Sequence, residues 1–452
     1  MNYPSHQTGE PIMSMQACPV FDANSDLYRS IGVLKVIETA VRKHGDIVIL
    51  HTRDDRDTYL LSGQQSVRFW HEHAAHLPSE IDDARSSPAT THVLLGDGAQ
   101  GVSWAQVGVP LRRKLKAIAG DMDQWFEENL KGAAAAFLDE AQTPVPDLLQ
   151  LCRHWSVRSL CHTIFGTAFP DTEFVDGLIQ VQLFHRFMYG KTTATLQDAE
   201  KLQEYQETRA FLDRVVRTNI ASAQPGDRTV LASLLEAMPA GIDLDTQIDH
   251  LRPVLFRILF EKLSFNGLNL FWALVHLAQN PELADAIAAE AISSSADDAD
   301  AYPLSVAAAK ETLRLYPEYS FIYRRTKQDL PFGEVMIPSQ STILISPWLL
   351  HRDERYWRRP THFDGQRFAA TNDTPACYLP FGIGPKALKQ RSFALCQIAV
   401  SLRAICAAVA FSLSPECPPG NLRPFLRSEL APRGAVPVIF KRRSETQAST
   451  LN

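Results

Sequence analysis

The chain has 452 residues, of which 45% are hydrophobic and 21% are charged, and this composition is sufficient to form a large buried core. Its formal net charge of −6 provides no basic field for nucleic acid, so nucleic-acid-binding proteins are excluded. The seven cysteines are scattered without a C-x-x-C pair, so we expect reduced thiols and predict no metal site.

The N-terminal part predicts an arm, then a helix and a hairpin. Residues 1–30 are expected to form the arm. Residues 1–20 show neither a basic start followed by an apolar run nor a stretch of about 18 apolar residues, so we expect a cytoplasmic protein without a membrane anchor. Apolar residues at helical spacing predict a helix over 31–44, and two β-rich runs over 47–51 and 59–61 predict the hairpin.

Helices are predicted through the middle of the chain. The pattern is helical over most of residues 111–238, and a long helix is predicted over residues 248–279. The acidic, serine-rich residues 293–300 are expected to form a solvated connection to a further helix. That helix is expected to end at Tyr316, because the next residue is a proline.

Strands return after these helices. Alternating apolar residues predict strands within residues 334–346, and a last helix is predicted from near Gln390 to Phe411. The polar residues 443–452 are expected to form a frayed tail. No linker rich in glycine, serine or proline divides residues 31–442, so we expect one large domain there, although its length exceeds the usual size.

One carboxylate and two arginines lie in two short segments of the C-terminal half of the chain. Glu311 and Arg314 form an E-x-x-R motif near the end of a predicted helix, and Arg367 follows within the segment Phe363–Phe368. A buried carboxylate can accept bidentate hydrogen bonds from guanidinium groups, which fixes its geometry.

The segment from Phe381 to Ala394 resembles the haem-binding signature of the cytochrome P-450 family, F-x-x-G-x-R-x-C-x-G-x-x-x-A. Three positions match that signature, namely Phe381, Gly384 and Ala394. Three others depart from it, namely Lys386, Leu388 and Gln390. The E-x-x-R motif and the segment around Arg367 are similar to two further family motifs, and this resemblance implies that Glu311, Arg314 and Arg367 form a structural triad. The resemblance covers about residues 31–442 and implies a cytochrome P-450-like fold, mainly α-helical with small β-sheets.

The departures concern the iron ligand first. Leu388 stands where the family carries the cysteine that binds haem iron, and leucine has no lone pair for a metal. Lys386 replaces an arginine and has no bidentate fork, and Gln390 replaces a glycine. We therefore expect no cofactor. The alternative is haem held by apolar contacts and a propionate anchor, with water or a substituted ligand on the iron.

The resemblance also locates a candidate pocket on the central helix. The acid–alcohol pair that relays protons in the family falls on Ser264 and Phe265, and phenylalanine cannot relay a proton. Polar groups on or near this face give a candidate pocket of four residues, namely Glu261, Ser264, Phe265 and Asn266. The family's propionate contacts correspond to three possible anion contacts, namely Trp104, Arg324 and Arg325.

Three functions are compatible with these residues, and none is normal monooxygenase chemistry. The first is an auxiliary, activating subunit of a partner enzyme in secondary-metabolite biosynthesis, as in the family's haem-free partners of natural-product glycosyltransferases. The second is a haem-independent enzyme that uses the old pocket for a non-redox rearrangement or cyclisation of a lipophilic intermediate. The third is a haem-binding oxidoreductase with a non-cysteine axial ligand.

Overall fold

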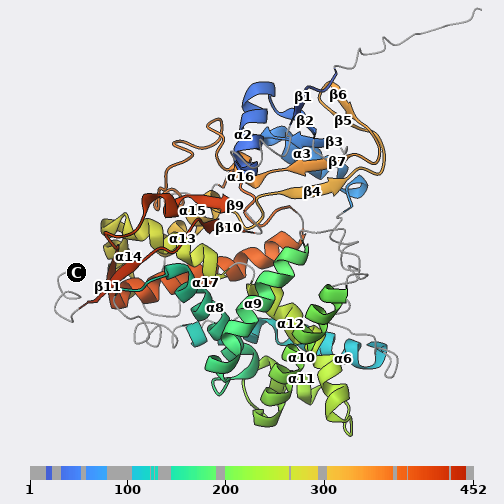
Figure 1. Cartoon of the computed structure of the whole chain (residues 1–452), viewed down its shortest axis with the longest axis vertical. Coiled ribbons are helices and arrows are strands. Elements are labelled where there is room, and N and C mark those ends of the chain that lie inside the picture. Colours follow the sequence, from blue (N-terminus) through green and yellow to red (C-terminus); the bar gives the residue numbers. More distant parts are fainter. Residues whose placement is uncertain are drawn as a thin grey trace, which may run out of the picture. The chain divides into compact units, whose positions relative to one another are not determined.

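The computed structural model describes residues 17–22, 32–51, 57–78, 104–122, 124–126, 128–130, 144–189, 199–263, 266–293, 303–369, 374–383, 385–426 and 429–443. The chain forms two compact units, shown in Figure 1. The first unit comprises residues 1–80 and 321–350, and the second comprises residues 81–320 and 351–452. The expectation of one domain over residues 31–442 stays a prediction.

The first unit is built on one mixed sheet. Its five strands follow the order β1 (Val20–Asp22), β2 (Ile47–His51), β3 (Asp57–Leu61), β7 (Thr342–Ile345) and β4 (Ile322–Arg325). The predicted hairpin is present as the antiparallel pair β2–β3. Strand β7 joins β3 in parallel register, so segments nearly 300 residues apart in sequence lie side by side, seen as blue and orange arrows in Figure 1. Strand β1 lies within the predicted N-terminal arm and pairs with β2.

Short helices complete the first unit. They are α2 (Val33–His44), α3 (Gly63–His73), η1 (Ala74–His76) and α16 (Pro347–Leu350), and a small hairpin is formed by β5 (Leu330–Phe332) and β6 (Val335–Ile337). The Trp348 indole N–H donates to Glu38 Oε1 at 2.9 Å, which joins α16 to α2. The buried aliphatic residues of the sheet, such as Leu60 and Ile343, form this unit's core together with α2.

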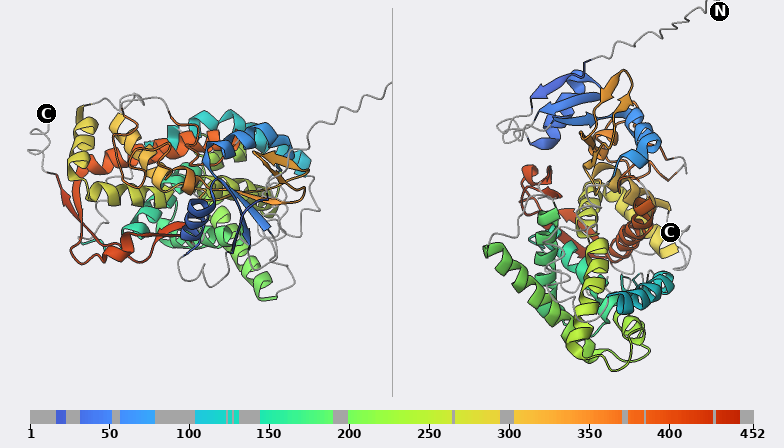
Figure 2. Two further views of the ribbon diagram at one scale, coloured as in Figure 1. Left: turned by 90° about the horizontal axis from the view of Figure 1, so that it is seen from above. Right: turned by 90° about the vertical axis from the view of Figure 1, so that its right-hand side faces the viewer.

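The second unit consists mainly of helices. They are α6 (Trp104–Ala117), α8 (Leu148–Phe165), α9 (Asp171–Tyr189), α10 (Ala199–Ser222), α11 (Val230–Glu236), α12 (Leu244–Leu263), α13 (Asn266–Ala278), α14 (Pro281–Ser293), α15 (Pro303–Leu315) and α17 (Pro385–Ala408). Helix α13 is apolar around most of its circumference because it packs against α8, α17 and α15. Figure 2 shows these helices from two further directions. Among the described residues, no helix is both long and apolar enough to cross a membrane.

Helices α13 and α8 approach each other closely at Gly267. A Cβ atom at Gly267 would lie 2.8 Å from the Cα atom of Arg153 on α8, which is closer than real Cβ contacts allow. Only a residue without a side chain permits this backbone approach. The Arg153 guanidinium forms an ion pair with Glu429, which stands just before β10 (Leu430–Pro432).

Helix α15 begins at a carboxylate supplied by the preceding helix. Glu290 of α14 accepts hydrogen bonds from the backbone N–H of Leu304 at 2.7 Å and of Ser305 at 3.2 Å. The Ser305 hydroxyl donates to the same carboxylate at 2.6 Å. These contacts satisfy N–H groups that a helix start leaves unpaired, and a negative charge there is favourable. The result is a firmly held start for the helix that carries the E-x-x-R motif.

The sequence-based prediction was wrong about the end of the last helix. The helix predicted from Gln390 to Phe411 begins at Pro385 and ends at Ala408, because the next residues form β8 (Val409–Leu413). Strand β8 pairs with β11 (Val438–Arg442), and the side chains of Val409 and Phe411 suit a strand as well as a helix. The sequence also missed β9 (Pro424–Leu426), β10 and the short helix η3 (Pro419–Leu422).

Other predictions lie partly outside the described residues. The long helix predicted over residues 248–279 is described as α12 and α13, and residues 264–265 between them lie outside the described part. Most of the predicted connection over residues 293–300 and of the tail over residues 443–452 also lies outside it. The helix predicted to end at Tyr316 is α15, which ends one residue earlier.

Candidate functional site

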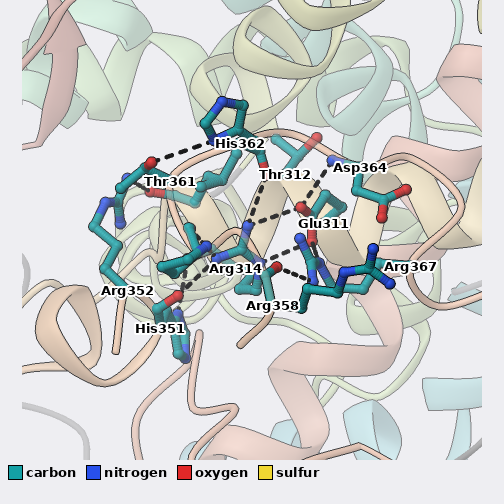
Figure 3. A network of polar contacts seen from close by, with 12 residues as sticks. Glu311, Thr312, Arg314, His351, Arg352, Arg358, Thr361, His362, Asp364 and Arg367 are labelled. Atoms are coloured by element: carbon teal, nitrogen blue, oxygen red, sulfur yellow. Dashed lines mark hydrogen bonds and ion pairs between the residues drawn. The ribbon is translucent and has the colours of Figure 1, made fainter. Parts of the chain in front are cut away.

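The E-x-x-R motif forms a buried ion pair in the last turns of α15. Glu311 and Arg314 are both fully buried. The Arg314 Nε atom donates to Glu311 Oε2 and its Nη2 atom donates to Glu311 Oε1, each at 2.8 Å, as Figure 3 shows. Because residues i and i+3 share one face of a helix, the motif's spacing alone brings the two side chains together. The geometry is bidentate, the strongest form of this contact.

The same carboxylate receives two further donors. Arg367 Nε donates to Glu311 Oε2 at 3.0 Å, and the backbone N–H of Asp364 donates to Oε1 at 2.9 Å. Arg367 also donates through Nη1 to the carbonyl of Arg358 at 2.8 Å. Each oxygen of Glu311 therefore accepts two hydrogen bonds. The structure brings the three predicted triad residues into one cluster (Figure 3).

The Arg314 guanidinium is hydrogen-bonded through its whole donor set. Besides the two bonds to Glu311, Nη1 donates to the carbonyls of His351 and Pro360, both at 2.6 Å, and Nη2 donates to the carbonyl of His362 at 3.1 Å. Its plane also lies over the Trp357 ring at 5.2 Å. An arginine has five N–H donors, so these five bonds use its full capacity. The chain between residues 351 and 362 is thereby fastened to α15.

A buried histidine links this cluster to the segment that precedes the signature-like loop. His351 Nδ1 lies 2.9 Å from the carbonyl of Arg314, and the Leu379 backbone N–H donates to His351 Nε2 at 2.7 Å. Burial, with the nearby Arg314 charge, lowers the pKa of His351 to about 3. The imidazole is therefore neutral at physiological pH. Sequence reasoning missed this residue, since its partners are backbone atoms.

Cys377, eleven positions before Leu388, is a buried and protonated thiol. Burial raises the pKa of Cys377 to about 11, although a hydrogen bond with the Trp357 indole opposes that rise. Thiolate, not thiol, binds metals. The side chain is therefore a neutral thiol at physiological pH, and it is hydrogen-bonded to Trp357.

A second pair missed from the sequence lies between α13 and the end of α15. His276 Nε2 lies 3.1 Å from the Tyr316 hydroxyl, and the His276 ring stacks on Phe363 with centroids 4.3 Å apart. Burial, with the charges of Arg314 and Arg352, lowers the pKa of His276 to about 4, and burial raises the pKa of Tyr316 to about 12. Both groups are thus neutral. The signal available in the sequence was one histidine on a mostly apolar helix.

Most of the predicted loop and pocket side chains lie outside the described part of the structure. Phe381 is buried, whereas Gly384 lies outside the described residues. For five other predicted residues, which lie in α17, α12 and α13, only the backbone is described, namely Lys386, Leu388, Gln390, Glu261 and Asn266. Ser264 and Phe265 lie outside entirely, and only the backbone of Trp104, the first residue of α6, is described. These assignments stay predictions.

The two candidate anion contacts on β4 have different surroundings in the first unit. The Arg324 guanidinium lies over the Trp70 ring at 4.3 Å, and its Nη1 donates to the carbonyl of Tyr323 at 2.7 Å. Arg325 is exposed, and its Nε donates to the carbonyl of Gln340 at 3.4 Å. Neighbouring residues of a strand point to opposite faces, so the two arginines do not act as one cluster.

Comparison with known proteins gives one family. The family model described as cytochrome P-450 matches residues 35–424. Cytochrome P-450 71B25 of Arabidopsis thaliana is 27% identical over 216 residues, which cover 43% of this chain and 42% of that protein. Cytochrome P-450 3A11 of Mus musculus is 38% identical over 109 residues, which cover 24% of this chain and 22% of that protein. The matches thus span less than half of these relatives' length.

Solved structures of the same family share the fold across nearly the whole chain. A cyanobacterial cytochrome P-450 with retinoic acid bound has a TM-score of 0.70 at 17% identity, covering 95% of this chain and 100% of that one. A zebra fish cytochrome P-450 with abiraterone has a TM-score of 0.66 at 19% identity, covering 91% of this chain and 99% of that one. At these identities the likeness shows the fold alone.

Proposed function

The chain belongs to the cytochrome P-450 family, and from that premise we propose that it is a haem-free member that acts as an auxiliary subunit of a partner enzyme in secondary-metabolite biosynthesis. The observation that carries the proposal is Leu388, which stands where the family's signature has its iron-binding cysteine. A leucine cannot ligate iron. Without a cysteine thiolate as axial ligand of the iron, the family's usual oxygen activation cannot take place.

The surrounding donors do not fit a haem-thiolate centre. Cys377 is buried, protonated and hydrogen-bonded to Trp357, and His351 already uses both ring nitrogens. Moving either side chain to an iron would break contacts inside the buried cluster.

The fold's internal contacts support a scaffold role. The Glu311 cluster is completed by side chains and backbone of the protein itself, with four donors on one carboxylate. A chain of this kind can keep its shape after losing a cofactor. A rigid subunit that binds only the folded form of its partner stabilises that partner by mass action, by about 2.7 kcal/mol at a hundredfold excess over Kd.

The first test is haem content. The natural protein and the variants Leu388→Cys and Leu388→Ala are each produced in haem-supplemented cells, and bound haem is measured by absorption spectrum and pyridine haemochromogen assay. We expect no stoichiometric haem in the natural protein or in Leu388→Ala, which controls for lost bulk, and uptake in Leu388→Cys. Stoichiometric haem in the natural protein would refute the proposal and favour an oxidoreductase with another axial ligand.

The second test is the effect on a partner. Biosynthetic enzymes encoded beside this chain, glycosyltransferases first, are produced with and without it, and their soluble yield, thermal midpoint and kcat are compared. We expect one enzyme to gain in all three measures. Turnover of a lipophilic intermediate by this chain alone, with no effect on any such enzyme, would instead support the haem-independent enzyme.

A further inference from the structure

His351 joins two segments of the second unit that are far apart in the sequence. On one side, its Nδ1 atom lies 2.9 Å from the carbonyl oxygen of Arg314 in α15. On the other side, its Nε2 atom lies 2.7 Å from the backbone nitrogen of Leu379. A backbone N–H can only donate and a carbonyl can only accept, so Nε2 carries no proton and Nδ1 carries one. A single neutral tautomer satisfies both bonds.

The surroundings of the ring oppose any other protonation state. His351 is fully buried and stacks on Tyr378 with ring centroids 5.4 Å apart. The charged groups that act on it, Arg314 and Arg352, are both cations and lower its pKa, and they outweigh the backbone hydrogen bonds with Arg314 and Cys377, which favour a proton on the ring. A second proton would have to enter at Nε2, against the Leu379 N–H, and would add a positive charge beside two others. The geometry therefore fixes both the ring and its tautomer.

The segment that follows Leu379 is held from the same side. The Tyr378 hydroxyl donates to the carbonyl of Lys310 at 2.9 Å, and the backbone N–H of Tyr319 donates to the carbonyl of Pro380 at 3.4 Å. The Gly382 N–H donates back to the carbonyl of Leu379 at 3.0 Å, closing a turn. The described residues just before the signature-like loop are thus attached to α15 and the chain after it through protein contacts.

We propose that His351 is a positioning residue that couples the Glu311–Arg314 pair to residues 377–383 and so fixes the entrance of the signature-like loop without a cofactor. The proposal is separate from the auxiliary-subunit function, because it concerns loop order and not haem content or a partner. His362 provides a matched control. It belongs to the same cluster, but its side chain is exposed and it contributes its carbonyl to Arg314.

The test uses variants that each keep one of the two bonds. In His351→Gln the amide oxygen can reach the position of Nε2, and in His351→Asn the amide nitrogen can reach that of Nδ1, whereas His351→Leu provides neither contact. Hydrogen exchange of a peptide covering residues 376–383 is measured by mass spectrometry. We expect exchange at Leu379 to become at least about 10-fold faster in His351→Asn and His351→Leu, and to stay slow in His351→Gln and His362→Ala.

A second readout reports the tautomer directly in the full, natural chain. Imidazole 15N resonances of the histidine-labelled protein are recorded between pH 5 and 8, and the His351 signals are assigned by their loss in His351→Gln. We expect a neutral ring with the proton on Nδ1 and no titration in this range. A proton on Nε2, titration within the range, or equal exchange at Leu379 in all variants would overturn the proposal. The tautomer measurement stands even if a variant fails to fold.

Discussion

Replacing Glu311 by glutamine should destabilise the second unit strongly. In the structure, each carboxylate oxygen of Glu311 accepts two N–H donors. A glutamine turns one oxygen into an NH₂ group, so in either orientation two donors face a donor and lose their acceptor. Hydrogen bonds to charged groups contribute about 1.5–3 kcal/mol each, and removing one partner of a buried ion pair costs about 3–5 kcal/mol. Since these figures overlap, we expect a loss of about 3–6 kcal/mol.

Such a loss is a large part of the roughly 5–15 kcal/mol that holds a folded protein together. The measurement is the guanidinium chloride midpoint, followed by tryptophan fluorescence and by circular dichroism, together with the soluble yield. Glu290→Gln is the matched control, because it makes the same chemical change at the start of α15, where Glu290 accepts backbone N–H groups. We expect that control to lose about 1 kcal/mol, as for other helix caps.

The two variants separate the explanations. If Glu311 acts as a buried acceptor of charged donors, Glu311→Gln must shift the midpoint several times further than Glu290→Gln. Equal midpoints for the two variants would refute this reasoning. They would show that losing a carboxylate charge has the same effect at either position, whatever donors surround it.

Three further results are expected. His351 has a pKa of about 3 in the folded protein, below its unfolded value of about 6.5, so its contribution to stability is complete above pH 6.5 and is lost as the pH falls toward 3. At pH 5 the free energy of unfolding should have fallen by about 2 kcal/mol for this reason. The variant His351→Gln should therefore show a smaller fall in denaturation midpoint between pH 6.5 and 5. Gly267→Ala should cost about 1–3 kcal/mol by separating α13 from α8, whereas Gly120→Ala, in open space, should be neutral or stabilising in the same unfolding assay. Ellman's reagent should label exposed Cys396 in the native protein and leave Cys377 unlabelled until denaturant is added; rapid native labelling of Cys377 would contradict its burial.

The sequence predicts the Glu311 cluster better than it predicts the contacts around it. The motif Glu311-x-x-Arg314 places two complementary side chains on one helix face, so the spacing by itself predicts their contact. The role of His351 is not visible in this way, because it binds a carbonyl and an N–H that any residue would provide. Phe411 shows a third case, where the same apolar residues suit a helix or a strand and only pairing with β11 decides.

The complete use of the Arg314 donors has a consequence for the evolution of this chain. A lysine offers three donors from a single nitrogen and cannot reach the five acceptors that Arg314 serves. Every conservative substitution of Arg314 therefore leaves buried acceptors without a donor, whereas an exposed position such as Arg325 tolerates single substitutions. Among descendants of this protein, we expect Arg314 to persist long after the residues around Leu388 have diverged further.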